Sequence, residues 1–73
     1  MFVLYYQNFP YGYGELATYK TRDQFPDLWY DIIRLENWNP LSNETDQNFH
    51  DIVIDLLNNK QYKDDHIIVE YRS

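Results

Sequence analysis

Five large apolar side chains in the second half of the chain recur with the period of an α-helix. They follow one another at i, i+3, i+4, i+7 and i+8, and they are Phe49, Ile52, Val53, Leu56 and Leu57. Residues 42–46, just before them, are rich in helix-capping side chains and in acids that favour the positive end of a helix dipole. Asn58-Asn59-Lys60 ends the pattern. The spacing therefore predicts an amphipathic helix with one apolar face available to cover a core.

A second helix is predicted over residues 23–36. Thr21 and Gln24 fit a capping box, and Pro26 falls within the first turn, where its missing N–H costs little. An apolar face at helical spacing follows, made of Phe25, Leu28, Trp29, Ile32 and Leu35. The helix is expected to end at residues 37–40, because the residue before Pro40 is pushed out of the α region.

Strands are predicted on either side of the two helices. Residues 2–7 are β-branched and aromatic with no breaker, and residues 15–20 are a weaker candidate. Residues 9–14 between them hold a proline and both glycines of the chain, which favours a hairpin loop. Residues 67–72 alternate with the period of a strand, and the polar residues 61–65 before them are expected to form a loop.

The predicted order is ββααβ. We expect one domain, residues 1–73, of the two-layer α+β class, in which two amphipathic helices cover one face of a three-stranded sheet. The sequence leaves open whether the last strand lies beside the first or at the far edge. A chain of 73 residues without cysteine has no disulfide or thiolate zinc site to reinforce it, so its core is expected to rely on aromatic packing.

The negative charge is concentrated in the middle of the chain. Residues 22–55 carry eight acids and two bases, which equals the net charge of −6 of the whole chain. Such a field repels membrane surfaces and nucleic acid backbones, and it attracts basic proteins. Aspartates recur every four residues within each predicted helix, and they are Asp23, Asp27, Asp31, Asp51 and Asp55.

Carboxylates one helical turn apart, about 6 Å, approximate the spacing of phosphates along one nucleic acid strand. These aspartates therefore predict an acidic helical layer that can occupy a basic groove built for DNA or RNA, as a DNA mimic does. The plainer interpretation is a solvated, charged helix surface.

Aromatic rings gather in the predicted hairpin loop. Tyr11 and Tyr13 stand beside glycines, an arrangement that suits base or sugar stacking, but residues 9–14 contain no lysine or arginine to bind a phosphate backbone. We therefore expect no direct nucleic acid binding. The loop is interpreted mainly as a turn that lends rings to a small core, with Tyr11 and Tyr13 facing outward. Together with Trp38 they are candidate apolar anchors for a protein partner.

Signs of catalysis and of cofactor binding are missing from the sequence. It contains no nucleophile with a paired base, no glycine-rich phosphate loop and no HExxH motif. His50 and His66 stand near acids, but their spacing matches neither a zinc nor a calcium template, and residues 64–66 are interpreted as a strand-entry loop. We expect no enzyme activity, no cofactor and no metal.

These observations favour a small non-enzymatic binding protein. It would inhibit or regulate a partner by docking its acidic helical face on a basic surface, a nucleic-acid-binding cleft being one candidate. By likeness of composition alone, a short acidic, aromatic-rich chain is the kind of product that phages and mobile elements use against host proteins.

An alternative is a self-associating module, a homodimer formed through a sheet edge or an aromatic surface. No basic region precedes the first apolar run, and the apolar runs are far shorter than the roughly 20 residues of a membrane span. A cytoplasmic, soluble protein without membrane contact is therefore expected.

Overall fold

The computed structural model describes residues 1–7 and 12–73 of the chain. Its elements in order are the strands β1 (Phe2–Gln7) and β2 (Tyr13–Tyr19), the short 3-10 turn η1 (Arg22–Gln24), the helices α1 (Phe25–Glu36) and α2 (Asn43–Asn59), and the strands β3 (Gln61–Lys63) and β4 (Ile67–Tyr71). Of the predicted hairpin loop, residues 9–11 lie outside the described residues, whereas Tyr13 and Gly14 belong to β2, which begins two residues earlier than predicted.

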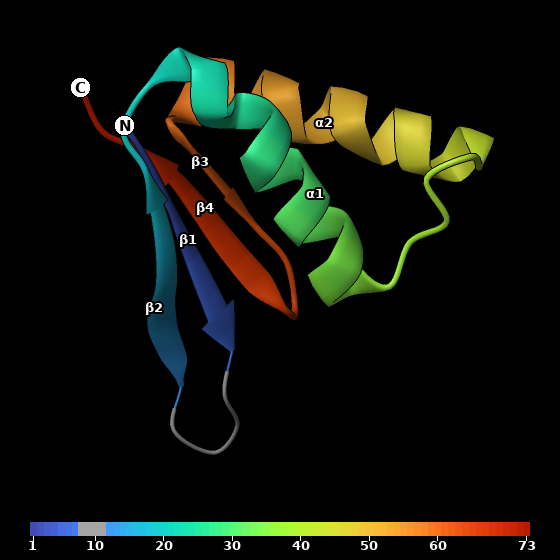
Figure 1. Ribbon diagram of the computed structural model, residues 1–73, viewed down its shortest axis with the longest axis horizontal. Helices are drawn as coiled ribbons and strands as arrows, with labels where there is room; N and C mark the ends of the chain where they lie inside the picture. The colour runs from blue at the N-terminus through green and yellow to red at the C-terminus, as the bar shows by residue number, and fades with distance from the viewer. Residues whose placement is uncertain (8–11) are drawn as a thin grey trace.

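The strands form an antiparallel sheet with the order β2-β1-β4-β3. The C-terminal strand therefore lies beside β1, which settles the alternative that the sequence left open. Figure 1 shows both helices on the same side of this sheet, with α1 drawn alongside β3 and α2 running across the upper end of the strands. The expected two-layer α+β architecture with two helices is confirmed.

The prediction of three strands was wrong, because residues 61–63 form the edge strand β3 and not a loop. β3 pairs with β4 through Gln61 with Glu70, Tyr62 with Val69 and Lys63 with Ile68. Only Tyr62 of these three turns its side chain partly into the protein. A strand of three residues with a single apolar position gives no alternation that sequence analysis can detect.

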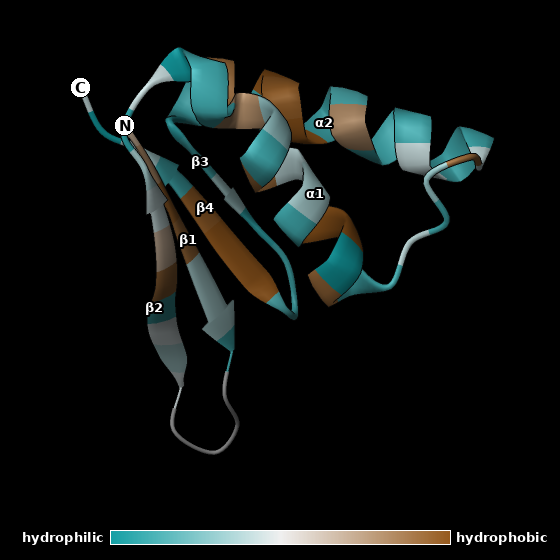
Figure 2. Ribbon diagram, in the orientation of Figure 1, coloured by the Kyte–Doolittle hydropathy of each residue, from teal (hydrophilic) through white to brown (hydrophobic). Residues whose placement is uncertain are grey.

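The core lies between the sheet and the helices. Leu4 of β1 and Val69 of β4 are paired across the sheet, and they pack with Leu28 and Ile32 of α1 and with Ile52 of α2 in one buried cluster. Figure 2 shows β4 as a strongly hydrophobic strand beside the hydrophilic β3. Burial of these aliphatic side chains is the main driving force that holds the helices on the sheet.

Aromatic rings extend this core between the two helices, as the composition led us to expect. Trp29 of α1 meets the ring of Phe49 of α2 edge to face, with centroids 4.8 Å apart, and Phe25 meets Phe49 at 5.9 Å. Phe25 also contacts Phe2 of β1 at 5.5 Å. These edge-to-face pairs suit the ring quadrupoles and connect α1, α2 and the sheet.

No helix in the described part of the chain is long and apolar enough to span a membrane.

Candidate functional site

The aspartates of α1 lie on the side of the helix that faces β2. The hydroxyl of Tyr19, at the end of β2, donates a hydrogen bond to Asp31, and Arg34 forms an ion pair with the other oxygen of that carboxylate at 2.7 Å. Burial, the hydrogen bond to Asp31 and the charges of Asp31 and Asp27 raise the pKa of Tyr19. Asp27 is therefore near the same hydroxyl. Asp23 lies in η1 and is exposed.

Asp55 of α2 lies on the flank of the helix that approaches β3. Glu44, Asp51 and Asp55 follow one another at i, i+7 and i+11, which places them within an arc of roughly 40° on one side of the helix. Gln47 donates a hydrogen bond to Asp51 at 3.0 Å, and the charge of Asp55 contributes to the raised pKa of Tyr62 on β3. We call Glu44, Asp51 and Asp55 the acidic row.

The structure therefore does not bring the five predicted aspartates together. Asp27 and Asp31 adjoin β2, Asp55 adjoins β3, and these two strands are the opposite edges of the sheet. Asp31 is also neutralised by Arg34. The acidic row on α2 is free of basic neighbours along its own helix, because residues 43–59 contain no lysine or arginine.

α2 also exposes two large aliphatic side chains. Ile54 is 46% exposed and Leu57 is 69% exposed. Leu57 was expected on the core face, but the apolar arc of α2 is wider than the sheet and α1 can cover, so this residue reaches solvent. Ile54 is one residue before Asp55 and, at about 100° per residue, lies beside the acidic row. Leu57 is two residues after Asp55 and therefore lies roughly 160° from it around the helix. The side of α2 that faces away from the core thus has the acidic row on one flank, Ile54 in the middle and Leu57 on the other flank, and we call it the outward side of α2.

A groove of about 490 Å³ opens on the other flank of α2. Its walls include the rings of Phe2, Phe25 and Phe49 and the side chain of Leu57, and the basic residues Arg22 and Lys60 border it. The groove is large enough to accept apolar side chains. Its two cations contrast with the acidic row, so the two flanks of α2 differ in charge.

The predicted aromatic anchors make contacts within the chain. The Tyr13 hydroxyl donates a hydrogen bond to the backbone carbonyl of Asp64 at 3.0 Å, and the Lys63 ammonium lies 5.5 Å from the Tyr13 ring. Trp38 packs against Trp29 with centroids 6.1 Å apart, at the margin of the core. Tyr11 lies outside the described residues.

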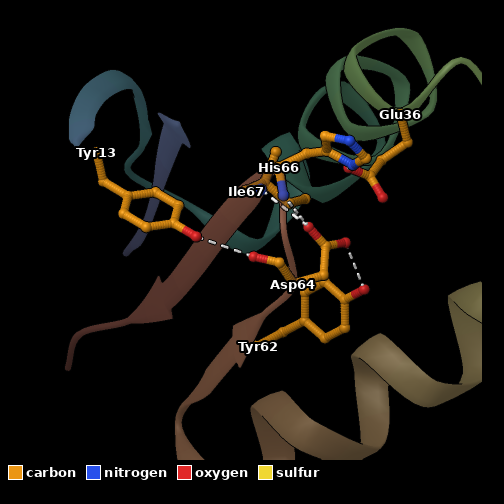
Figure 3. Close-up of polar contacts among 6 residues, drawn as sticks. All are labelled: Tyr13, Glu36, Tyr62, Asp64, His66 and Ile67. Atoms are coloured by element: carbon orange, nitrogen blue, oxygen red, sulfur yellow. Dashed lines mark hydrogen bonds and ion pairs between the residues drawn. The ribbon is translucent and has the colours of Figure 1, made fainter. Parts of the chain in front are cut away.

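A cluster of polar side chains forms where the end of α1 meets the loop between β3 and β4 (Figure 3). Glu36, Asp64 and His66 each offer one ligand atom, and these atoms lie within 4.8 Å of one another. The Glu36 side chain is only 5% exposed. Its Oε1 lies 3.2 Å from Nδ1 of His66, but no hydrogen bond reaches this oxygen from the described residues. We call Glu36, Asp64 and His66 the carboxylate–histidine cluster.

Asp64 is held in place from several directions. Its Oδ1 accepts hydrogen bonds from the backbone N–H groups of His66 at 2.7 Å and Ile67 at 2.9 Å, and its Oδ2 accepts one from the Tyr62 hydroxyl at 2.7 Å. Burial alone would raise the pKa of Asp64, but the neighbouring Glu36 carboxyl and these hydrogen bonds together lower it. Asp64 is therefore the ionised member of the pair.

Glu36 has the opposite character. Burial is the main cause that raises the pKa of Glu36 to about 8. The contact with the Asp64 carboxyl group and the negative charges of Asp64 and Asp65 raise it further. Two carboxyl groups so close together do not both ionise readily in a site of low polarity. In the absence of a cation, Glu36 therefore keeps its proton near neutral pH.

This cluster could not be predicted from the sequence, because no motif connects Glu36 with residues 64–66. Glu36 ends a helix far from residues 64–66 in the chain, and only the packing of α1 against the β3–β4 loop brings it there. The prediction that residues 64–66 form a loop leading into a strand is confirmed.

Comparison of the chain with protein-family models, curated proteins and solved structures gave no match. The structure therefore defines the class of fold, a two-layer α+β domain, and the function is argued from the surfaces described above.

Proposed function

We propose that this chain is a non-enzymatic binding protein that docks the outward side of α2 on a basic surface of a partner protein. The observation that carries the proposal is the combination on one helix of the acidic row with the exposed side chains of Ile54 and Leu57. Carboxylates select a basic partner and speed association, while exposed aliphatic groups supply contact energy that salt does not screen.

The aliphatic groups favour a protein partner over nucleic acid. A nucleic acid backbone would be repelled by the net charge of −6 and offers little to Ile54 and Leu57. A protein with basic residues around an apolar patch complements both features. The groove beside Leu57 can take an apolar side chain of the partner, while Arg22 and Lys60 at its border repel cations, so the partner's basic residues would face the acidic row. Where the partner's basic surface binds DNA or RNA, docking would block it and the chain would act as an inhibitor.

The proposed surface is narrower than the acidic layer expected from the sequence. Asp31 is engaged by Tyr19 and Arg34, so its carboxylate is not free for a partner. Asp23 lies in η1 and Asp27 lies near Tyr19 of β2, so both are outside the proposed surface and serve as controls for charge reversal. The binding role is assigned to Asp51, Asp55, Ile54 and Leu57.

Site-specific photo-crosslinking locates the surface. A photoreactive phenylalanine derivative replaces Leu57 in one version of the chain and Tyr30 in another, since Tyr30 is 75% exposed on α1. We expect a discrete cross-linked product from position 57 in a lysate and none from position 30. The partner is then identified, purified and used in binding measurements.

Charge reversal tests the electrostatic part. With the purified partner, the double variant Asp51→Lys, Asp55→Lys should bind at least about tenfold more weakly, since reversing close interfacial charges typically costs more than 1.4 kcal/mol. The double variant Asp23→Lys, Asp27→Lys changes the net charge equally and should bind almost as well as the parent. Equal loss in both variants would show that only overall charge matters and would contradict docking through α2.

Self-association through β2 is a second candidate. β2 is an edge strand, and it carries Leu16 with 52% of its surface exposed. The pairing of β2 with β1 shifts register between Leu4 and Tyr5, a bulge of the kind that blunts sheet edges. Sedimentation at two protein concentrations decides the matter: a dimer that Leu16→Lys dissociates and high salt leaves intact supports this candidate, and a monomer excludes it.

A further inference from the structure

We propose that Glu36, Asp64 and His66 form a binding site for a divalent first-row transition-metal ion. The site is separate from the outward side of α2 and does not depend on the proposed binding function. Two carboxylate oxygens and one imidazole nitrogen form a donor set used for zinc, manganese, cobalt and nickel. The nitrogen distinguishes the site from calcium and magnesium sites, which take oxygen ligands.

The geometry suits such an ion. Bonds from zinc to imidazole nitrogen and carboxylate oxygen are about 2.0 to 2.2 Å long, so two ligand atoms on one tetrahedral ion are about 3.5 Å apart. The three candidate atoms lie within 4.8 Å of one another. Nδ1 of His66 and Oε1 of Glu36, 3.2 Å apart, are already close to this spacing, and a movement of up to about an ångström brings the third ligand atom into place. The side chain of His66 is 65% exposed and so has room to make this movement.

The buried oxygen of Glu36 is the second, independent indication. Glu36 is 95% buried, and its Oε1 points into the cluster with no hydrogen bond from the described residues (Figure 3). A buried polar atom without a partner is rare in a folded protein and destabilises it. A cation bonded to Oε1 would satisfy this atom, and by replacing the Glu36 proton it would let both the Glu36 and Asp64 carboxylates be ionised side by side.

The surrounding contacts orient the ligands. The Tyr62 hydroxyl and the two backbone N–H groups fix the Asp64 carboxylate, as outer-shell partners do in established metal sites. Three protein ligands leave further coordination positions to water, which reaches the site beside the exposed His66. The bound ion would join the end of α1 to the β3–β4 loop, so binding would also stabilise the fold.

Thermal unfolding with and without metal is the first test. The protein is stripped with a chelator and dialysed, and zinc, manganese, magnesium and calcium chlorides are added separately. We expect zinc and manganese to raise the Tm in a concentration-dependent way, and magnesium and calcium to have little effect. No rise with any transition metal, or an equal rise with calcium, would overturn the proposal.

Variants assign the ligands. His66→Ala and Glu36→Gln should each weaken zinc affinity, measured by calorimetry, by at least about tenfold, since losing even an outer-shell partner costs about 10–100-fold. His50→Ala removes the other histidine and Asp65→Asn removes the adjacent acid, and both should bind zinc like the parent chain. Unchanged affinity in either His66→Ala or Glu36→Gln would overturn the assignment.

Paramagnetic broadening by manganese locates the bound ion directly and does not depend on a change in protein stability. In the parent protein, added manganese should broaden the backbone amide signals of His66 and Ile67 in NMR spectra while signals from the start of α2, near Glu44, stay sharp. Broadening that is centred on the acidic row would place the ion elsewhere and overturn the proposal.

Discussion

The Tyr19 hydroxyl at the end of β2 donates a hydrogen bond to Asp31 in the middle of α1. Arg34 binds the second oxygen of the same carboxylate, so Asp31 has a hydroxyl on one side and a guanidinium on the other. The Tyr19 ring belongs to the buried core, and its hydroxyl is part-buried where it meets α1. An aspartate that resembles a binding residue in the sequence therefore has a structural role.

Removing this hydroxyl should destabilise the protein. A typical hydrogen bond contributes about 1 kcal/mol net to stability, and one to a charged acceptor contributes more. We therefore expect Tyr19→Phe to lower the free energy of unfolding by somewhat more than about 1 kcal/mol. Urea denaturation followed by tryptophan fluorescence measures the change. Tyr30→Phe removes the same group from an exposed tyrosine on α1 and should have no effect. Equal stability of the two variants would contradict the structural role of Asp31.

The stability of the metal-free protein should fall as pH rises from about 4.5 to 8. Folded Glu36, with a pKa of about 8, holds its proton over this range, whereas in the unfolded chain the group ionises near its ordinary pKa of 4.5. Because the folded state binds more protons, the free energy of unfolding decreases with pH by at most about 1.4 kcal/mol per unit. Below about pH 4 the lowered pKa of Asp64 acts in the opposite direction, so stability should fall again in acid.

The Glu36→Gln variant should flatten this profile between pH 5 and 8 in a chelator-containing buffer. His66→Ala and Asp65→Asn are the matched controls, because His66 and Asp65 face the same carboxyl group. Each should keep most of the slope, since burial of Glu36 is its first cause. A slope that persists in Glu36→Gln and disappears in His66→Ala would assign the effect to the imidazole and contradict the prediction.

The parts of the fold with strong periodicity could be predicted from the sequence. The spacing from Phe49 to Leu57 located α2, although Leu57 itself is exposed, and the position of Pro40 located the end of α1. α1 begins two residues later than the sequence predicted, because the capping box of Thr21 and Gln24 caps the short turn η1 and not α1 itself. β3 was missed because three residues with one partly buried side chain show no alternation.

The candidate sites were harder to predict from the sequence, because they depend on which flank of each helix faces which edge of the sheet. Spacing showed that Asp27 with Asp31, and Asp51 with Asp55, are neighbours along a helix. It could not show that the first pair adjoins β2 and the second approaches β3. The contact of Glu36 with the β3–β4 loop likewise arises only from tertiary packing.

Core truncation should unfold much of the protein. Leu28 of α1 is fully buried within the cluster between helices and sheet, and a Leu→Ala change at such a site costs about 2–5 kcal/mol. A chain of this size has only a few kcal/mol of net stability, so Leu28→Ala should be largely unfolded at 37 °C by circular dichroism. Leu41→Ala, at an almost fully exposed position between the helices, should leave the Tm unchanged. A folded Leu28→Ala variant at that temperature would contradict the assigned core.

The start of α2 should depend on the Ser42 side chain. Its Oγ accepts a hydrogen bond from the backbone N–H of Glu44 at 3.1 Å, and Ser42 has the extended backbone of an N-cap. Ser42→Ala leaves this N–H without its partner and should cost about 1 kcal/mol in urea denaturation, whereas Ser42→Asn keeps an accepting oxygen and should stay near the parent value. Because the acidic row begins at Glu44, fraying in Ser42→Ala should also speed amide hydrogen exchange there, ahead of exchange around Asp55. Uniform exchange along α2 in this variant would show that the helix is held by its packing alone and that the cap contributes nothing.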